Sequence, residues 1–161
     1  MEQVDARPPL YLVRHGQSEW NARGLIQGQT AHPALTATGR EQARSAAEQI
    51  RADLVPQRLA VGAITTSDLA RAAQTAAILA AALGGRQRTD PRWREQYLGD
   101  LQGLTRSQAR TLPPPSGRDI DVGESDAALR ERMAAAVAAL DRSTVHVVVS
   151  HRRALRQLAH A

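Results

Sequence analysis

The sequence predicts an α/β domain in which helices cover both faces of a mostly parallel sheet. Short runs rich in β-branched residues alternate along the chain with longer, Ala-rich stretches that have helical spacing. This alternation is typical of parallel strands joined by helices. The length of 161 residues suits one domain. No internal repeat or second domain is visible, so we expect one three-layer α/β/α domain over residues 1–161.

The first half of the pattern begins with an apolar strand. Leu10–Arg14 (LYLVR) is predicted to be this strand. A helix is predicted over Thr36–Leu54, because apolar residues recur there at helical spacing. Leu59–Thr65 (LAVGAIT) is predicted to be the second strand. Ser67 is a good N-cap for a helix that runs to about Leu83, where two glycines end it.

The second half repeats the alternation after a Pro-rich segment. Leu112–Gly117 (LPPPSG) is predicted to be a loop. Ser125 is expected to cap a helix that runs to about Leu140. Thr144–Val149 (TVHVVV) is the clearest strand of the chain, and a short helix is expected from Arg152 onwards.

Composition narrows the class of function. The chain has no cysteine, which excludes disulfides, thiolate chemistry and cysteine metal sites. No spacing of His, Asp and Glu indicates a metal site, so we expect neither a metal nor a cofactor. Met1–Pro9 is polar and no apolar run approaches the roughly 20 residues of a membrane span, so we expect a cytoplasmic protein without a membrane partner.

The net charge of +5 has two explanations: a GC-rich coding sequence, which favours Arg and Ala codons, or an anionic partner. All 21 basic residues are arginines, they are scattered along the chain, and aromatic residues make up 2% of it. A nucleic-acid-binding protein would more often show a clustered basic face with aromatic stacking platforms. Small anionic molecules are therefore the expected partners, and no nucleic acid is expected.

Two histidines and two arginines are predicted to meet at one edge of the sheet. Ligands of open α/β sheets bind beyond the carboxyl ends of the strands. Arg14 and His15 end the first strand, and His151 ends the last. Arg71 falls in the first turn of a helix, where its positive charge needs a nearby anion.

This combination of residues favours phosphate chemistry. Two guanidinium groups bind the oxygens of a phosphate in bidentate fashion. A neutral imidazole beside them can attack phosphorus and form a covalent intermediate. The leaving oxygen then needs a proton, and Glu95 is a candidate acid by elimination. As an alternative, Glu95 is a salt-bridge partner of Arg92 or Arg94.

The same residues carry a resemblance to a known family. Arg14–Asn21 (RHGQSEWN) resembles the signature of the histidine phosphatase superfamily, the phosphoglycerate-mutase-like proteins. Further blocks resemble that family in the right order over nearly the whole chain. These blocks are Gln27-Gly28 with Leu35–Ala43, Thr66–Ala76, Arg94-Glu95 with Leu98–Leu104, Gly123–Ser125 and Val147–His151.

The resemblance implies a phosphoglycerate-mutase-like fold and a role for each matching residue. His15 would carry the phosphoryl group, Arg14, Arg71 and His151 would hold its oxygens, and Glu95 would be the proton donor. The residues that the resemblance and the pattern place on the substrate side are Ser18, Asn21, Gln27, Gly28 and Arg152. His146, inside the last strand, is expected to be structural.

The sequence departs from the family pattern at three places. Arg152 and Arg153 stand where relatives have Gly after the second histidine. The segment between Gly103 and Gly123, which covers the substrate in relatives, is short, so we expect an open site. The chain ends ten residues after His151, where relatives continue, so we expect a short C-terminus and an uncovered sheet edge. Association into a homodimer stays open.

Three functions follow from these observations. The favoured one is a hydrolase, a metal-independent phosphatase that cleaves a phosphomonoester of a small metabolite through a phosphohistidine on His15. The second is a phosphoglycerate mutase, which must keep water from its intermediate under a short cover. The third is a catalytically weak phospho-ligand binding or regulatory protein. The substrate stays open among sugar phosphates, phosphoglycerate derivatives, nucleotide-derived monoesters and phosphohistidine proteins.

Overall fold

The computed structural model describes residues 7–112 and 121–158. Apart from Leu112, the loop predicted at Leu112–Gly117 lies outside these residues. Within the described ranges, none of the helices combines the length and the apolarity that crossing a membrane requires.

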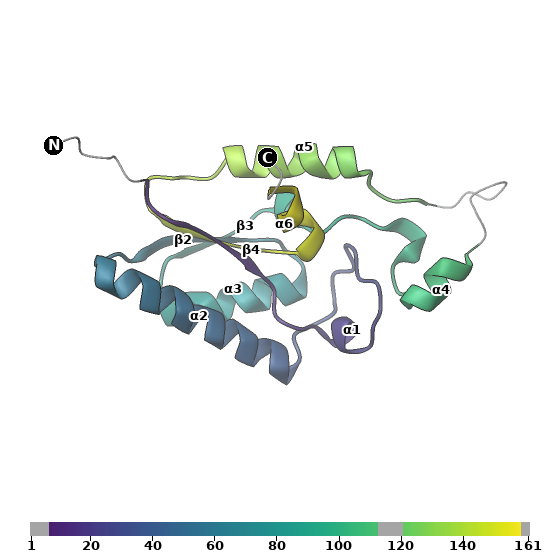
Figure 1. Cartoon of the computed structure of the whole chain (residues 1–161), viewed down its shortest axis with the longest axis horizontal. Helices are drawn as coiled ribbons and strands as arrows, with labels where there is room; N and C mark the ends of the chain where they lie inside the picture. Colours follow the sequence, from purple (N-terminus) through teal and green to yellow (C-terminus); the bar gives the residue numbers. More distant parts are fainter. Residues whose placement is uncertain (1–6, 113–120, 159–161) are drawn as a thin grey trace.

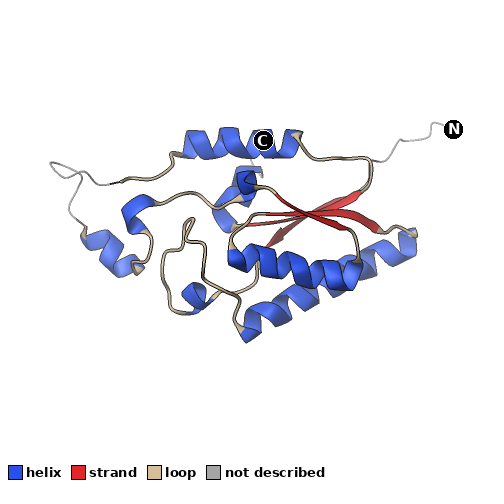
Figure 2. Cartoon of the chain, turned by 180° about the vertical axis from the view of Figure 1, so that it is seen from behind, coloured by secondary structure: helices blue, strands red, loops and turns tan. Residues whose placement is uncertain are grey.

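The centre of the molecule is a four-stranded parallel sheet in the order β1-β4-β2-β3. Its strands are β1 (Leu10–Arg14), β2 (Val61–Thr66), β3 (Arg86–Thr89) and β4 (Val145–Ser150). Figures 1 and 2 show the strands running side by side between layers of helices. The predicted parallel sheet is confirmed, and its valine-rich strand β4 is an inner strand with all of its residues buried.

Helices cover the two faces of the sheet, which confirms the predicted three-layer α/β/α arrangement. On one face lie α2 (Ala37–Gln57) and α3 (Ala70–Leu83), and on the other lie α5 (Asp126–Ala138) and α6 (Arg152–Leu158) (Figure 1).

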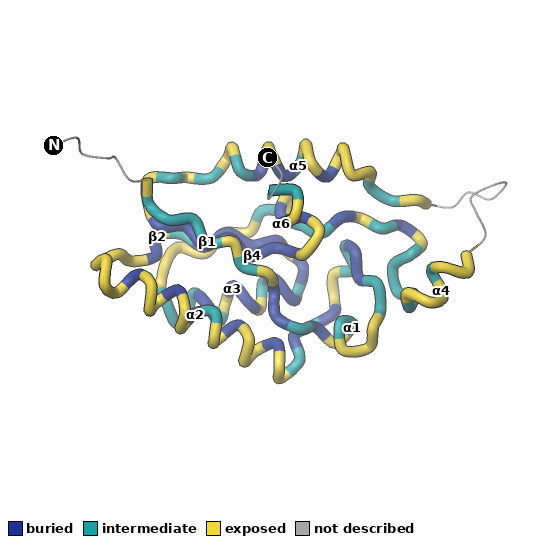
Figure 3. Tube along the Cα trace, in the orientation of Figure 1, coloured by how far each residue is buried: buried dark blue, intermediate teal, exposed yellow. Residues whose placement is uncertain are grey.

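Alternate residues of β4 point to opposite faces of the sheet and join two separate cores. Val147 and Val149 pack with the residues of α2 and α3. Val148 packs with Trp93, Leu129 and the other buried residues beneath α5 and α6. Figure 3 shows buried positions alternating with exposed ones along α2 and α5, with the buried positions on the side toward the sheet.

Most of the predicted boundaries are close to the observed ones. Thr36 caps α2 by accepting a hydrogen bond from Gly39 N, but the helix continues past Leu54 to Gln57. Ser125 caps α5 through Ala128 N, as expected, although the helix ends at Ala138 rather than Leu140.

The prediction that Ser67 caps the third helix is wrong. α3 begins at Ala70, and its N-cap residue Leu69 makes no side-chain capping bond. Ser67 is fully buried, and its hydroxyl bonds to His151 instead of to the helix backbone.

Several short elements were not predicted. They are α1 (Glu19–Ala22), β3, α4 (Arg106–Thr111) and the 3₁₀ turns η1 (Pro91–Trp93) and η2 (Gly99–Leu101). β3 is polar and exposed at every position, so it has no alternation of apolar residues that would identify a strand.

Two glycines let the first turn of α2 approach the loop that follows β1. A Cβ atom on Gly16 would lie 2.2 Å from the carbonyl oxygen of Gly39, and one on Gly39 would lie 2.1 Å from that of Gln17. Larger residues do not fit at either position. This contact places the residue before Gly16, His15, beside the helix layer.

Candidate active site

His15 is a buried, neutral imidazole. It follows β1, and 7% of its surface is exposed. Its Nδ1 lies 2.7 Å from the carbonyl oxygen of Gly16, and since a carbonyl only accepts, Nδ1 carries the proton. Burial lowers the pKa of His15 to about 3; the Gly16 carbonyl opposes this, and the charges of Arg71 and Arg14 add to it. The unprotonated Nε2 is therefore available as a nucleophile at neutral pH.

His151 lies next to His15, although 136 residues separate them in the sequence (151 − 15). The ring centroids are 5.0 Å apart and the rings are tilted by 56°. His151 is fully buried, and its Nε2 lies 2.7 Å from Ser67 Oγ. Burial, and then the charge of Arg71, lower the pKa of His151 well below its usual value. Among the described residues its Nδ1 has no hydrogen-bond partner.

Arg71 brings a buried positive charge to the two histidines. Its Nη1 donates to the Thr30 carbonyl at 2.9 Å and its Nη2 to the Gly28 carbonyl at 2.7 Å. Burial lowers the pKa of Arg71 to about 10, which Glu95 opposes, so the side chain stays charged at neutral pH. Its Nε is buried and has no partner within the described part of the chain.

The unpartnered atoms of Arg71 and His151 indicate a ligand. Buried polar atoms in folded proteins almost always have a hydrogen-bond partner. Two buried atoms without a partner are Arg71 Nε and His151 Nδ1. The charge of Arg71 lowers the pKa of His15, and the ring of His151 lies against the ring of His15. Oxygen atoms of an anion bound beside His15 would satisfy both.

Glu95 is held by backbone amides rather than by an arginine. Its carboxylate accepts hydrogen bonds from the N–H groups of Gln96 at 2.9 Å, Ala154 at 3.0 Å and Arg153 at 3.1 Å. Two of these amides belong to the first turn of α6. Glu95 therefore ties η1 and its following loop to the helix that comes after His151.

The alternative salt bridges for Glu95 are not made. Arg92 pairs with Asp90 at 2.7 Å, and Arg94 pairs with Asp68. The idea that Glu95 neutralises a neighbouring arginine of its own segment is therefore wrong, and its side chain is left facing the pocket.

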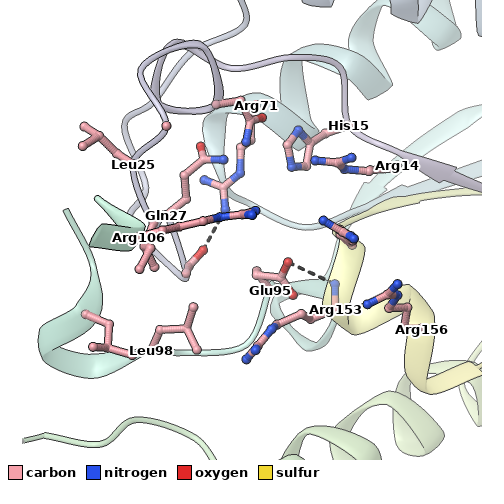
Figure 4. A pocket seen from close by; sticks show the side chains of 16 residues that line it. Arg14, His15, Leu25, Gln27, Arg71, Glu95, Leu98, Arg106, Arg153 and Arg156 are labelled. Carbon is pink, nitrogen blue, oxygen red and sulfur yellow. Dashed lines mark hydrogen bonds between the residues drawn. The ribbon is translucent and has the colours of Figure 1, made fainter. Parts of the chain in front are cut away.

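Most of the predicted site residues line one pocket of about 480 Å³. Figure 4 shows its arginines, from several elements, around Glu95 and His15. The predicted residues that line it are Arg14, His15, Asn21, Gln27, Gly28, Arg71, Glu95 and Arg152. Within the described ranges, no group of three or more His, Asp or Glu side chains is placed to hold a metal ion.

Two predicted residues, Ser18 and His151, are not among the residues that line this pocket. Ser18 is fully buried; its hydroxyl accepts from Asn21 N at 3.1 Å and donates to Gln27 Oε1 at 2.6 Å. It does not line the pocket, and its expected contact with substrate stays a prediction. Instead, it positions two residues that do line it. His151 reaches the site through its ring contact with His15.

Sequence reasoning missed several pocket residues. Three are arginines, Arg106, Arg153 and Arg156, and four are apolar, Leu25, Ile26, Leu98 and Leu101. Arg156 could have been found, because it lies four residues after Arg152 and thus on the same side of a helix. Arg106 has no such signal, since its position depends on how the chain folds after Leu101.

Comparison with known proteins identifies the family of this chain. A sequence model of the histidine phosphatase superfamily (branch 1) matches residues 10–161. The probable phosphoglycerate mutase GpmB of Yersinia enterocolitica is 39% identical over 91% of this chain and 70% of its own length. That of Photorhabdus laumondii is 39% identical over 80% of this chain and 60% of its own. The chain thus spans about 40 to 70% of the length of these curated relatives.

Solved structures share the fold. YhfR of Bacillus stearothermophilus aligns with a TM-score of 0.80 and 29% identity, over 93% of this chain and 77% of its own. A mycobacterial glucosyl-3-phosphoglycerate phosphatase in complex with VO3 aligns with a TM-score of 0.74 and 32% identity, over 96% of this chain and 79% of its own. The resemblance inferred from the motifs is confirmed, and the chain belongs to the histidine phosphatase superfamily.

Proposed function

We propose that this protein is a phosphatase that hydrolyses a phosphomonoester of a small metabolite through a phosphohistidine on His15. The observation that carries the proposal is the state of His15. Its Nδ1 is bonded to Gly16, and its neutral ring lines a pocket rich in arginine. A neutral imidazole with a free Nε2, beside guanidinium groups, is suited to attack a phosphate.

The reaction has two steps. In the first, Nε2 of His15 attacks phosphorus, the P–O bond to the alcohol breaks, and the phosphoryl group becomes bound to His15. In the second, water attacks phosphorus and gives a proton to the carboxylate that donated one in the first step, the P–N bond breaks, and inorganic phosphate leaves. We assign Arg14, Arg71 and His151 to the phosphoryl oxygens, because positive charge and N–H donors stabilise the charge on the transferred group.

The alcohol that leaves in the first step needs a proton, and we propose Glu95 as its source. Oε1 of Glu95 accepts two backbone N–H groups, whereas Oε2 accepts one. Oε2 therefore has capacity left to carry a proton.

A phosphoglycerate mutase is the second candidate, because curated relatives carry that name. Neighbours by structure are described as phosphatases, among them a phosphoserine phosphatase from Entamoeba histolytica in complex with 3-phosphoglyceric acid. The two activities share the phosphohistidine step. They differ in what takes the phosphoryl group from His15: water in a phosphatase, and a second hydroxyl of the bound substrate in a mutase.

A screen of phosphorylated metabolites separates these candidates. Wild-type protein and a His15→Ala variant are assayed for released phosphate, and 3-phosphoglycerate is also assayed for conversion to the 2-phosphate isomer. We expect phosphate release that is lost in His15→Ala. Isomer formation faster than phosphate release would favour the mutase. Tight binding of phosphorylated compounds with no turnover would favour the binding protein.

A further inference from the structure

The pocket holds more positive charge than one phosphate needs. Six arginines line it, Arg14, Arg71, Arg106, Arg152, Arg153 and Arg156, and its one acidic side chain is Glu95. With His15 neutral, the six arginines and Glu95 give the pocket lining a formal net charge of +5. A phosphomonoester carries about −1.5 to −2 at pH 7. About three positive charges thus remain when the phosphate is bound beside His15.

Two of these arginines, Arg152 and Arg156, form a separate group on α6. They are four residues apart, so their side chains lie on the same side of the helix. Both are exposed at the pocket wall, and neither has an ion-pair partner among the described residues. Arg153 differs, because its Nη1 donates to Gln96 Oε1. Figure 4 shows Arg156 on α6, across the pocket from Arg106.

The orientation of this arginine pair is fixed by the rest of the helix. Glu95 binds the backbone N–H groups of Arg153 and Ala154. Ala154 is fully buried against the core that contains Trp93. α6 is therefore held at its first turn by Glu95 and along one side by the core, while Arg152 and Arg156 line the pocket. Like charges at this spacing repel one another in a helix, and an anion between them removes that cost.

We infer that Arg152 and Arg156 form a second anion subsite, and that the preferred substrate carries another anionic group besides the phosphate transferred to His15. The inference rests on the proposed function and names its substrate class. The second group is a carboxylate or a further phosphate, because a guanidinium binds both through paired N–H donors.

A matched series of esters tests the subsite. The compounds are propyl phosphate, 3-phosphooxypropanoate and 1,3-propanediol bisphosphate, together with their six-carbon equivalents, since the spacing of the two anions is set by the pocket. They differ only in chain length and in whether the far end is neutral, a carboxylate or a phosphate. All assays are run at one ionic strength, because salt screens the general field of exposed charges.

The proteins are the wild type, a double variant Arg152→Gln/Arg156→Gln and a control Arg130→Gln. Arg130 is an exposed arginine of α5 that does not line the pocket. In the wild type we expect kcat/KM for a compound with a second anion to exceed that of the neutral ester by about tenfold or more, as for a hydrogen bond between charged groups. The double variant should lose most of this ratio, and the control should keep it.

The outcomes separate the inference from the proposed function. Equal kcat/KM for neutral and anionic ends at both chain lengths overturns the inference while leaving a phosphatase. A preference that survives in the double variant also overturns it. If no ester is hydrolysed, the proposed function fails, and equilibrium binding of the same compounds to the His15→Ala protein then measures the preference. Tighter binding of the carboxylate or of the bisphosphate identifies the second group.

Discussion

Ser67 Oγ lies 2.7 Å from Nε2 of His151, and both residues are fully buried. If the hydroxyl donates to Nε2, the ring proton stays on Nδ1, the atom that has no partner among the described residues. Ser67 then acts as a positioning residue: it sets which nitrogen of His151 offers an N–H group to the phosphoryl oxygens.

Replacing Ser67 tests this role. Ser67→Ala removes the hydroxyl, so the proton of His151 is no longer held on Nδ1. kcat should therefore fall by roughly tenfold while KM changes little, in line with the loss of one hydrogen bond. Ser67→Thr keeps a hydroxyl and should restore most of kcat. Steady-state kinetics on a generic aryl phosphate measure both. An undiminished kcat in Ser67→Ala would show that the contact does not orient His151.

The buried neutral state of His15 makes stability depend on pH. The pKa of His15 is lowered to about 3, whereas in the unfolded chain it is about 6.5. Below pH 6.5 the unfolded chain therefore binds a proton that the folded protein does not, and stability is lost as the pH falls toward 3. At pH 4.5 this loss amounts to about 2–3 kcal/mol relative to pH 7.

A non-titrating variant isolates that contribution. Urea unfolding of the wild type and of His15→Asn at pH 7 and pH 4.5 gives the change in unfolding free energy for each. The wild type should lose about 2–3 kcal/mol more than His15→Asn between the two pH values. The same loss in both proteins would mean that His15 titrates normally in the folded state.

Glu95 has two roles to separate, proton donation and the support of α6. As a general acid it matters most for a poor leaving group, so Glu95→Gln should slow hydrolysis of an alkyl phosphate by about 10²–10⁴-fold and that of an activated aryl phosphate far less. The measurement is the ratio of the two effects.

If Glu95 mainly holds α6 in place, Glu95→Gln should affect the two substrates differently from the loss of a general acid. The amides of Arg153 and Ala154 donate to different oxygens of Glu95, so a glutamine keeps an acceptor for one of them and places an NH2 group against the other. An equal loss for alkyl and aryl substrates, with a lower midpoint of thermal unfolding, would assign Glu95 to holding α6, and the proton would have to come from another group.

The sequence predicted the parts of the fold whose residues carry a repeating pattern. β4 contains four valines and α2 has apolar residues at helical spacing, so both were found. β3 (RQRT) is exposed and polar, and is a strand only because β2 lies beside it. α4 has a capping box between Thr105 and Gln108, a local signal by which it could have been identified.

The site residues that directly follow a strand could be predicted from the sequence. His15 and His151 each follow a strand, so the parallel sheet brings them together. The errors concern residues whose side chains have partners far away in the sequence. Ser67 was expected to cap a helix, yet its partner is His151, 84 residues on. The pocket arginines of α4 and α6 are likewise brought together by tertiary packing.

The most direct test of the account is to trap the phosphorylated enzyme. Wild-type protein is mixed with a ³²P-labelled phosphomonoester found in the screen, quenched in alkali within milliseconds, and mapped by proteolysis and mass spectrometry. Phosphate bound to nitrogen is stable in alkali and lost in acid. If His15 carries the phosphoryl group, the label is found on the peptide that contains His15, and none is found in His15→Ala. Turnover without a label on His15, or a label that persists in His15→Ala, would contradict it.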